Sequence, residues 1–129
     1  MVLENGERVR LIGVDTPEMS DTSRNNDSAR RNNLDRKTVN DFASGAKQFV
    51  RSLVEGKEVR LEYDWQRMDK YGRTLAYIYR QEDNLFLNAE IIRQGYGFPI
   101  VYFPFKLKND FERLQNEAKS ARRGLWQKA

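Results

Sequence analysis

The segment from Arg10 to Glu18, with the sequence RLIGVDTPE, constrains this chain more than any other. It begins with an arginine, continues through a short apolar run, and ends with two carboxylates around a proline. Both faces of the segment are largely apolar after Val9. We therefore predict a strand over residues 8–14 that is covered on both sides, as in a small barrel with a helix packed against it.

The spacing of Arg10 and Asp15 sets a geometric condition on this strand. The two residues are five positions apart, and a straight strand would send their side chains to opposite faces. Both can serve one site only if the strand twists, bulges or ends between them. Gly13 is the expected place for that break.

A second segment, DKYGRTLAYIY at residues 69–79, places another arginine at the start of another apolar strand. Asp69 and Gly72 occupy the first and fourth positions of a predicted turn, and Arg73 follows it. Two arginines and two carboxylates are what metal-assisted attack on a phosphodiester requires. The arginines bind the charged oxygens, one carboxylate holds a hard cation, and the other activates water.

Each motif also has an ordinary structural interpretation. Either arginine, taken alone, is a strand-end residue that extends its charge into solvent. The Asp-Thr-Pro-Glu sequence, outside this context, is a turn followed by the start of a helix.

The remaining pattern predicts an α+β chain. Apolar positions at helical spacing indicate three helices, over residues 46–54, 88–94 and 110–123. Asn88 and Asp110 are predicted to cap the second and third of them. Further strands are expected over residues 58–63, 73–80 and 85–87. Residues 19–40 form a polar tract that we predict to be a long loop, either an inert insertion or a functional element beside the site.

The composition narrows the chemistry. The 129 residues predict one domain over residues 1–129, and the chain contains neither cysteine nor histidine. This excludes a thiolate nucleophile, a Ser-His pair and zinc sites built on these residues. The net charge of +4 is compatible with a polyanionic partner. No apolar run is long enough to span a membrane, and no signal peptide is recognisable at the N-terminus.

Together, the two segments resemble the staphylococcal-nuclease (thermonuclease-like) family in both residues and order. The resemblance implies a small OB-fold-type β-barrel with three helices. That family begins with an Asp-Gly-Asp-Thr strand and turn, which supplies a further metal carboxylate and has no counterpart here. We therefore expect the first barrel strand to be missing, activity and calcium binding to be weakened, and self-association through the exposed strand edge.

The resemblance also implies roles for particular residues. Arg10 and Arg73 match the arginines that bind the phosphate and stabilise the transition state. Asp15 matches a calcium-binding carboxylate, and Thr16 matches the neighbour whose backbone carbonyl faces the ion. Glu18 matches the candidate general base, with water orientation as an alternative role.

Substrate-binding residues follow in the same way. Lys70 and Tyr71 match positions that contact a terminal phosphate, although they also suit an ordinary surface turn. Tyr102 is expected to stack on a nucleobase, with Phe103 as the alternative and core packing as an equally good explanation for either.

The implied function is a metal-dependent nuclease. It would use Ca²⁺ to hydrolyse phosphodiester bonds in DNA or RNA by in-line water attack and leave 3′-phosphate ends. The alternative is a non-catalytic barrel module that binds nucleic acid or protein. The resemblance points to a secreted or cell-envelope location.

Overall fold

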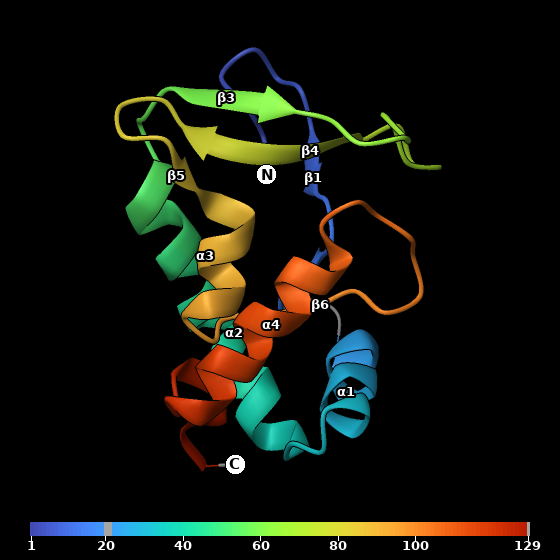
Figure 1. Ribbon diagram of the computed structural model, residues 1–129, viewed down its shortest axis with the longest axis vertical. Coiled ribbons are helices and arrows are strands. Elements are labelled where there is room, and N and C mark those ends of the chain that lie inside the picture. Colours follow the sequence, from blue (N-terminus) through green and yellow to red (C-terminus); the bar gives the residue numbers. More distant parts are fainter. Residues whose placement is uncertain (20–21, 129) are drawn as a thin grey trace.

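The computed structural model describes residues 1–19 and 22–128 (Figure 1). The strands are β1 (Val9–Leu11), β2 (Val14–Asp15), β3 (Val59–Glu62), β4 (Thr74–Arg80), β5 (Leu85–Phe86) and β6 (Phe98–Pro99). The helices are α1 (Thr22–Arg31), α2 (Arg36–Val54), α3 (Leu87–Arg93), α4 (Lys108–Ser120) and the 3₁₀ helix η1 (Gly124–Lys128). The chain is therefore an α+β protein, as predicted.

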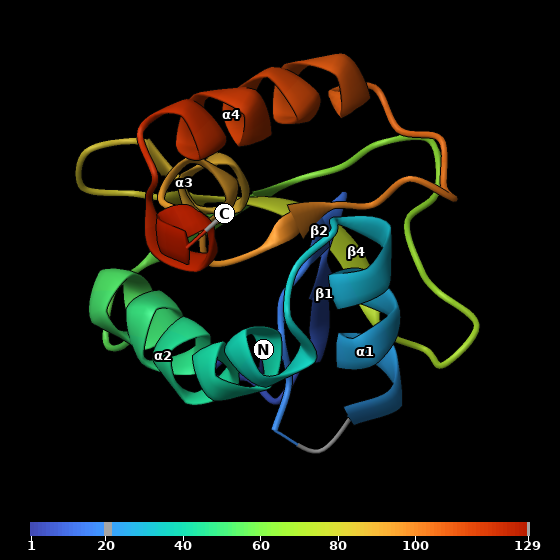
Figure 2. The same cartoon turned by 90° about the horizontal axis from the view of Figure 1, so that it is seen from below.

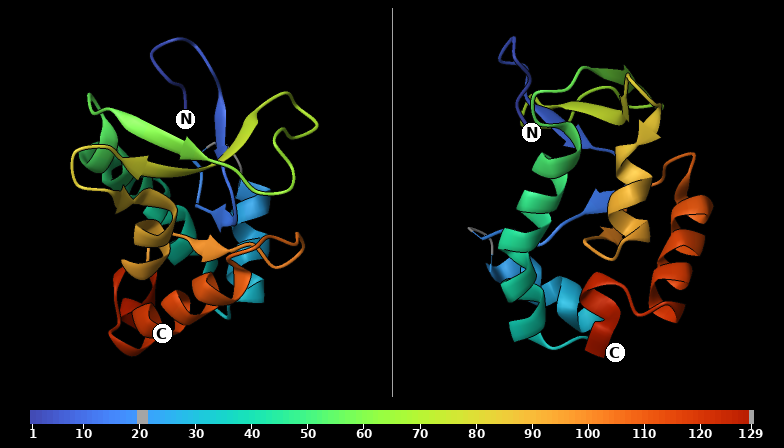
Figure 3. Two further views of the ribbon diagram at one scale, coloured as in Figure 1. Left: turned by 45° about the horizontal axis from the view of Figure 1, so that its top comes forward. Right: turned by 90° about the vertical axis from the view of Figure 1, so that its left-hand side faces the viewer.

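The strands form two hydrogen-bonded sheets. In the larger one, β4 lies between β1, which runs parallel to it, and β3, which runs antiparallel, and β5 also pairs with β4. The short strands β2 and β6 make a separate antiparallel pair. Figure 3 shows the larger sheet at one end, with α2 and α3 extending away from it. A closed barrel stays a prediction.

The predicted break at Gly13 is confirmed. β1 ends at Leu11 and β2 begins at Val14, and Gly13 between them has a φ of +76°, a conformation that favours glycine. A Cβ atom here would lie 2.4 Å from the ring of Phe105. Glycine is thus required both by the turn and by the aromatic ring packed against it.

The three predicted helices are present as α2, α3 and α4, but α1 corrects the prediction of a loop over residues 19–40. Residues 22–31 of that tract are helical, and α2 begins at Arg36 rather than near residue 46. Residues 20 and 21 lie outside the described part of the chain. Helix α1 packs on α2 and lies beside β2 (Figure 2). It buries few apolar side chains, and polar contacts hold it in place.

The predicted caps Asn88 and Asp110 are wrong. Helix α3 follows Phe86 as its N-cap, and α4 follows Leu107. Asn88 is instead fully buried. Its amide donates hydrogen bonds to the carbonyl oxygens of Ile12, at 3.0 Å, and Ala76, at 3.2 Å, and it accepts one from the N–H of Ile78 at 2.9 Å. This side chain therefore ties the turn after β1 to β4 and α3.

The N-terminal residues pair with the second edge of β1. The N–H of Val9 donates to the carbonyl of Met1 at 2.8 Å, and Val2 bridges to Arg8 in antiparallel fashion. The strand edge is thus partly covered by its own chain, and self-association through it stays a prediction. None of the helices in the described residues is long and apolar enough to cross a membrane.

Candidate active site

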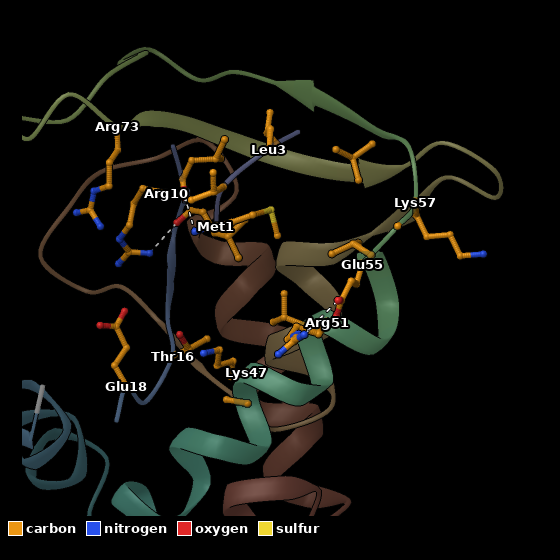
Figure 4. Close-up of a pocket in the computed structure, with 18 of the residues that line it drawn as sticks. Met1, Leu3, Arg10, Thr16, Glu18, Lys47, Arg51, Glu55, Lys57 and Arg73 are labelled. Atoms are coloured by element: carbon orange, nitrogen blue, oxygen red, sulfur yellow. Dashed lines mark hydrogen bonds and ion pairs between the residues drawn. The ribbon is translucent and has the colours of Figure 1, made fainter. Parts of the chain in front are cut away.

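An open groove runs between β1, the N-terminal residues and α2. Four of the predicted site residues line it, namely Arg10, Thr16, Glu18 and Arg73. In Figure 4 the side chains of Arg10 and Arg73 extend in the same direction, and the carboxylate of Glu18 is turned toward them. The groove also carries basic side chains from the α2 side, Lys47, Arg51 and Lys57.

Arg10 is held by the turn that Gly13 makes. Its Nη1 atom donates hydrogen bonds to the carbonyl oxygens of Val14, at 2.6 Å, and Leu11, at 3.1 Å. Burial, together with the nearby guanidinium of Arg24, lowers the pKa of Arg10. Because these hydrogen bonds use Nη1, the edge formed by Nε and Nη2 is left for a two-pronged contact with an anion.

Arg73 is positioned by the predicted turn and by strand pairing. Its Nε lies 2.7 Å from Oδ2 of Asp69, whose Oδ1 accepts the N–H groups of Tyr71 and Arg73. Burial alone would raise the pKa of Asp69, but these hydrogen bonds outweigh it and the pKa is lowered. Parallel pairing of β4 with β1 brings the start of β4 to the same end of the sheet as Arg10.

Asp15 and Thr16 lie where β2 ends. Pairing of Asp15 with Phe98 of β6 fixes the backbone, and the side chain of Asp15 is only 3% exposed. Gly97 packs directly behind, since a Cβ atom there would lie 3.1 Å from the carbonyl oxygen of Asp15. Asp15 is therefore buried and is not among the residues that line the groove.

Helix α1 supplies three partners for the Asp15 carboxylate. Nε of Arg24 lies 3.1 Å from Oδ1, the hydroxyl of Ser28 donates to Oδ2 at 2.9 Å, and Nη2 of Arg31 lies 3.6 Å from Oδ2. The contact between Arg24 and Oδ1 is an ion pair that does not meet the geometry of a hydrogen bond. The charge of the buried carboxylate is thus balanced by two guanidinium groups.

The same helix holds the segment that carries Glu18. The buried amide of Asn25 accepts the N–H of Glu18 at 2.9 Å and donates to its carbonyl oxygen at 2.7 Å. Nη2 of Arg24 lies 2.8 Å from Oε1 of Glu18 and donates to the carbonyl oxygen of Thr16 at 3.1 Å. Arg24 therefore contacts Asp15, Thr16 and Glu18 together.

These contacts test whether the site suits a metal ion. A carboxylate oxygen of Asp15, the carbonyl oxygen of Thr16 and a carboxylate oxygen of Glu18 converge on one positively charged group. Hard cations such as Ca²⁺ prefer this set of oxygen ligands. The described residues contain no group of three acidic side chains that could hold a metal. The ligands that the protein offers are therefore of the right chemical type but few in number.

The predicted substrate-binding residues lie outside the groove lining. Tyr71 is 63% exposed, and its ring lies 5.2 Å from Nζ of Lys70 and 5.6 Å from Cζ of Arg73. Tyr102 is 67% exposed and close enough to Arg10 to influence its pKa. Phe103 stacks on Trp65, so Tyr102 has the more accessible ring of the two candidates.

Sequence reasoning missed Arg24, Asn25, Ser28 and Arg31, because the tract was predicted to be a loop. A signal was present in the spacing. Arg24, Ser28 and Arg31 follow i, i+4, i+7 positions, which place side chains on one face of a helix. A polar stripe of this kind, close to an acidic motif, predicts a helix docked through ion pairs.

Comparisons with known proteins show which family the chain resembles. The family described as "Staphylococcal nuclease homologue" matches residues 8–128. A thermonuclease of Staphylococcus intermedius is 34% identical over 123 residues, covering 95% of this chain and 64% of the relative. An uncharacterized endonuclease of Escherichia coli is 35% identical over 126 residues, covering 97% and 78%.

An uncharacterized protein of Methanocaldococcus jannaschii is 35% identical over 130 residues, covering 95% of this chain and 63% of the relative. The chain thus spans just under two thirds of the length of the archaeal and staphylococcal relatives. The matched region includes both arginines, both carboxylates and the helices around them. This chain belongs to the staphylococcal nuclease family.

Proposed function

We propose that this protein is a calcium-dependent nuclease that hydrolyses phosphodiester bonds of DNA or RNA and leaves 3′-phosphate ends. The observation that carries the proposal is the common groove of Arg10, Arg73 and Glu18, with both guanidinium groups extending in one direction and the carboxylate facing them (Figure 4). The family's OB-type barrel is part of the same proposal. The nuclease proposal is supported by two relatives, one named a thermonuclease and one named an uncharacterized endonuclease.

The two arginines bind the phosphate in different ways. Arg10 offers the Nε and Nη2 edge of its guanidinium, since its Nη1 is engaged by backbone carbonyls. Arg73 uses Nε for Asp69 and therefore offers its terminal nitrogens. Charge on the phosphoryl oxygens increases in the transition state, so these fixed donors stabilise it more than the ground state.

Glu18 acts as the general base. It removes a proton from a water molecule, whose oxygen bonds to phosphorus in line with the departing 5′ oxygen. The P–O5′ bond breaks, the 5′ oxygen takes a proton from solvent, and the phosphate remains on the 3′ side. Asn25 holds the backbone of Glu18 on both sides and so limits the positions that the carboxylate can take.

Oxygens of Asp15, Thr16 and Glu18 would hold the metal. When bound, Ca²⁺ would supply a positive charge that helps to balance the charge of the transition state. The exposed rings of Tyr71 and Tyr102 offer surfaces on which bases can stack.

A cleavage assay tests the proposal. Single-stranded DNA and RNA labelled at the 5′ end are incubated with the parent protein in Ca²⁺ or in EDTA, and the ends are identified by sensitivity to a 3′-phosphatase. We expect calcium-dependent fragments that carry 3′-phosphates, and none from Asp15→Asn. Salt-dependent binding with no cleavage by any version would instead favour the binding module.

A further inference from the structure

Arg24 contacts the same three oxygens that the proposed metal ion would use. Its guanidinium lies 3.1 Å from Oδ1 of Asp15, 3.1 Å from the carbonyl oxygen of Thr16 and 2.8 Å from Oε1 of Glu18. The Arg24 side chain is 28% exposed, so it is largely enclosed by these partners. A positively charged group therefore already lies against all three oxygens of this position.

We propose that the guanidinium of Arg24 occupies the metal position, defined by the oxygens of Asp15, Thr16 and Glu18. A divalent ion then binds there only by displacing this guanidinium. This inference rests on the proposed function, because the metal position is part of that function. It makes Arg24 a positioning residue that sets the affinity of the site for metal.

Exchange follows from the state of the Asp15 carboxylate. Oδ2 already meets Ser28 and Arg31, and Oδ1 faces Arg24. A divalent ion placed on the Oδ1 side while Arg24 remains there would bring two positive groups together beside a carboxylate whose side chain is only 3% exposed, where repulsion is strong. The guanidinium must leave for the ion to enter.

The surroundings of Arg24 make its departure feasible. It lies near the start of α1, a helix whose buried residues are Asn25, Ser28 and Ala29, so only one of them is apolar. The exposed part of its side chain gives it a path to solvent. The exchange therefore breaks ion pairs and leaves the apolar core intact.

Calcium titration by calorimetry tests the exchange, with Arg24→Gln as the main variant. Arg30→Gln is the matched control, since it removes the same charge from the same helix at a side chain that is 76% exposed and paired with Asp27. We expect Arg24→Gln to bind Ca²⁺ more tightly by on the order of 10- to 100-fold, and Arg30→Gln to bind like the parent. Asp15→Asn should weaken binding in either background.

Arg24→Lys provides a second variant should the glutamine variant fail to fold. It keeps the charge but loses the planar contact with several oxygens, so its calcium affinity should fall between those of the parent and Arg24→Gln. Thermal melting gives an independent readout. Arg24→Gln should melt at a lower temperature than the parent in EDTA and gain more from added calcium.

The possible failures are distinct. Unchanged or weaker calcium binding in Arg24→Gln and Arg24→Lys, with binding still lost in Asp15→Asn, would overturn the exchange and leave the metal position intact. Calcium binding that is absent, or insensitive to Asp15 in every variant, would overturn the metal position and the exchange with it.

Discussion

The side-chain amide of Asn88 donates a hydrogen bond to the carbonyl oxygen of Ile12 at 3.0 Å. Asn88 is fully buried, and the same amide also serves the backbone of β4. This contact fixes the position of the turn that follows β1, and therefore of the strand that contains Arg10, relative to β4 and α3.

Asn88→Ala is accordingly expected to be strongly destabilising. It leaves the buried carbonyl oxygen of Ile12 and the N–H of Ile78 without their partner, and each such group costs about 1–3 kcal/mol. Urea denaturation measures the change in the free energy of unfolding. Asn116→Ala, at an exposed position on α4, is the control and should change stability little. Equal stability of both variants would contradict the role of Asn88.

Gly13→Ala should damage stability and activity together. The new Cβ atom would lie 2.4 Å from the ring of Phe105, at a φ of +76°, and we expect a loss of roughly 1–3 kcal/mol or more. Gly6→Ala is the matched control, because Gly6 also has a positive φ, +86°, but has no atom within 4 Å of its Cβ position. The difference between the two variants isolates the contact with Phe105. Similar losses in both would show that only the backbone conformation matters.

Arg10→Lys and Arg73→Lys should each lower kcat by roughly 10²- to 10³-fold, because lysine keeps the charge but cannot make a two-pronged contact with the phosphate. Steady-state cleavage of a short labelled oligonucleotide at saturating calcium measures this. Arg60→Lys on β3, where the arginine pairs with Glu62, is the control and should retain parental kcat. Near-parental rates for both site variants would remove the arginines from the mechanism.

Glu18→Gln should lower turnover by roughly 10²- to 10⁴-fold while leaving oligonucleotide binding close to that of the parent. The variant keeps the size of the side chain and the backbone contacts with Asn25, but it cannot accept a proton. Single-turnover cleavage and fluorescence anisotropy, measured on the same oligonucleotide, separate the two effects. Undiminished cleavage at saturating calcium would show that Glu18 is not the base.

Stability should fall in acid partly through Asp64. Burial alone would raise the pKa of this carboxyl, but hydrogen bonds from the hydroxyl of Tyr77 and from the N–H groups of Lys106 and Trp65 outweigh it and lower the pKa. A lowered folded-state pKa contributes stability that is fully present above the unfolded value of about 3.9 and is lost as pH falls through the folded value.

Unfolding free energies of the parent and Asp64→Asn, measured from neutral pH to about pH 3, test this contribution. The parent should lose more stability over that range than the variant. Asp41→Asn, which removes an exposed carboxylate from α2, should follow the parent. Parallel curves for the parent and Asp64→Asn would contradict the prediction.

The sequence predicted the parts of the site that depend on local rules. The break at Gly13, the turn from Asp69 to Gly72 and the strand after Arg73 follow from glycine placement and alternation of apolar residues. Three helices were predicted from apolar periodicity, because each buries one face against the core.

The parts that were not predicted depend on long-range polar contacts. Helix α1 buries little apolar surface, and its position is determined by Arg24, Ser28 and Arg31 around the Asp15 carboxylate. Asn88 has the residue type of a helix cap, and only the packed structure shows that its amide bonds to the turn after β1 and to strand β4. Apolar periodicity carries no information about such contacts.

The parallel pairing of β1 with β4 has a consequence for the order in which the protein folds. Val9 aligns with Thr74, so the strand that contains Arg10 and the strand that follows Arg73 are far apart in the chain, and pairings of this kind form slowly. A chain emerging from the ribosome would hold Arg10 and Glu18 long before Arg73 is synthesised. We expect cleavage activity to appear only with the last phase of refolding, after most helical signal has returned, which stopped-flow circular dichroism and timed cleavage assays would resolve. If the protein cleaves nucleic acid as proposed, this order would leave the RNA and DNA around it intact until Arg73 has been synthesised and its strand has paired with β1.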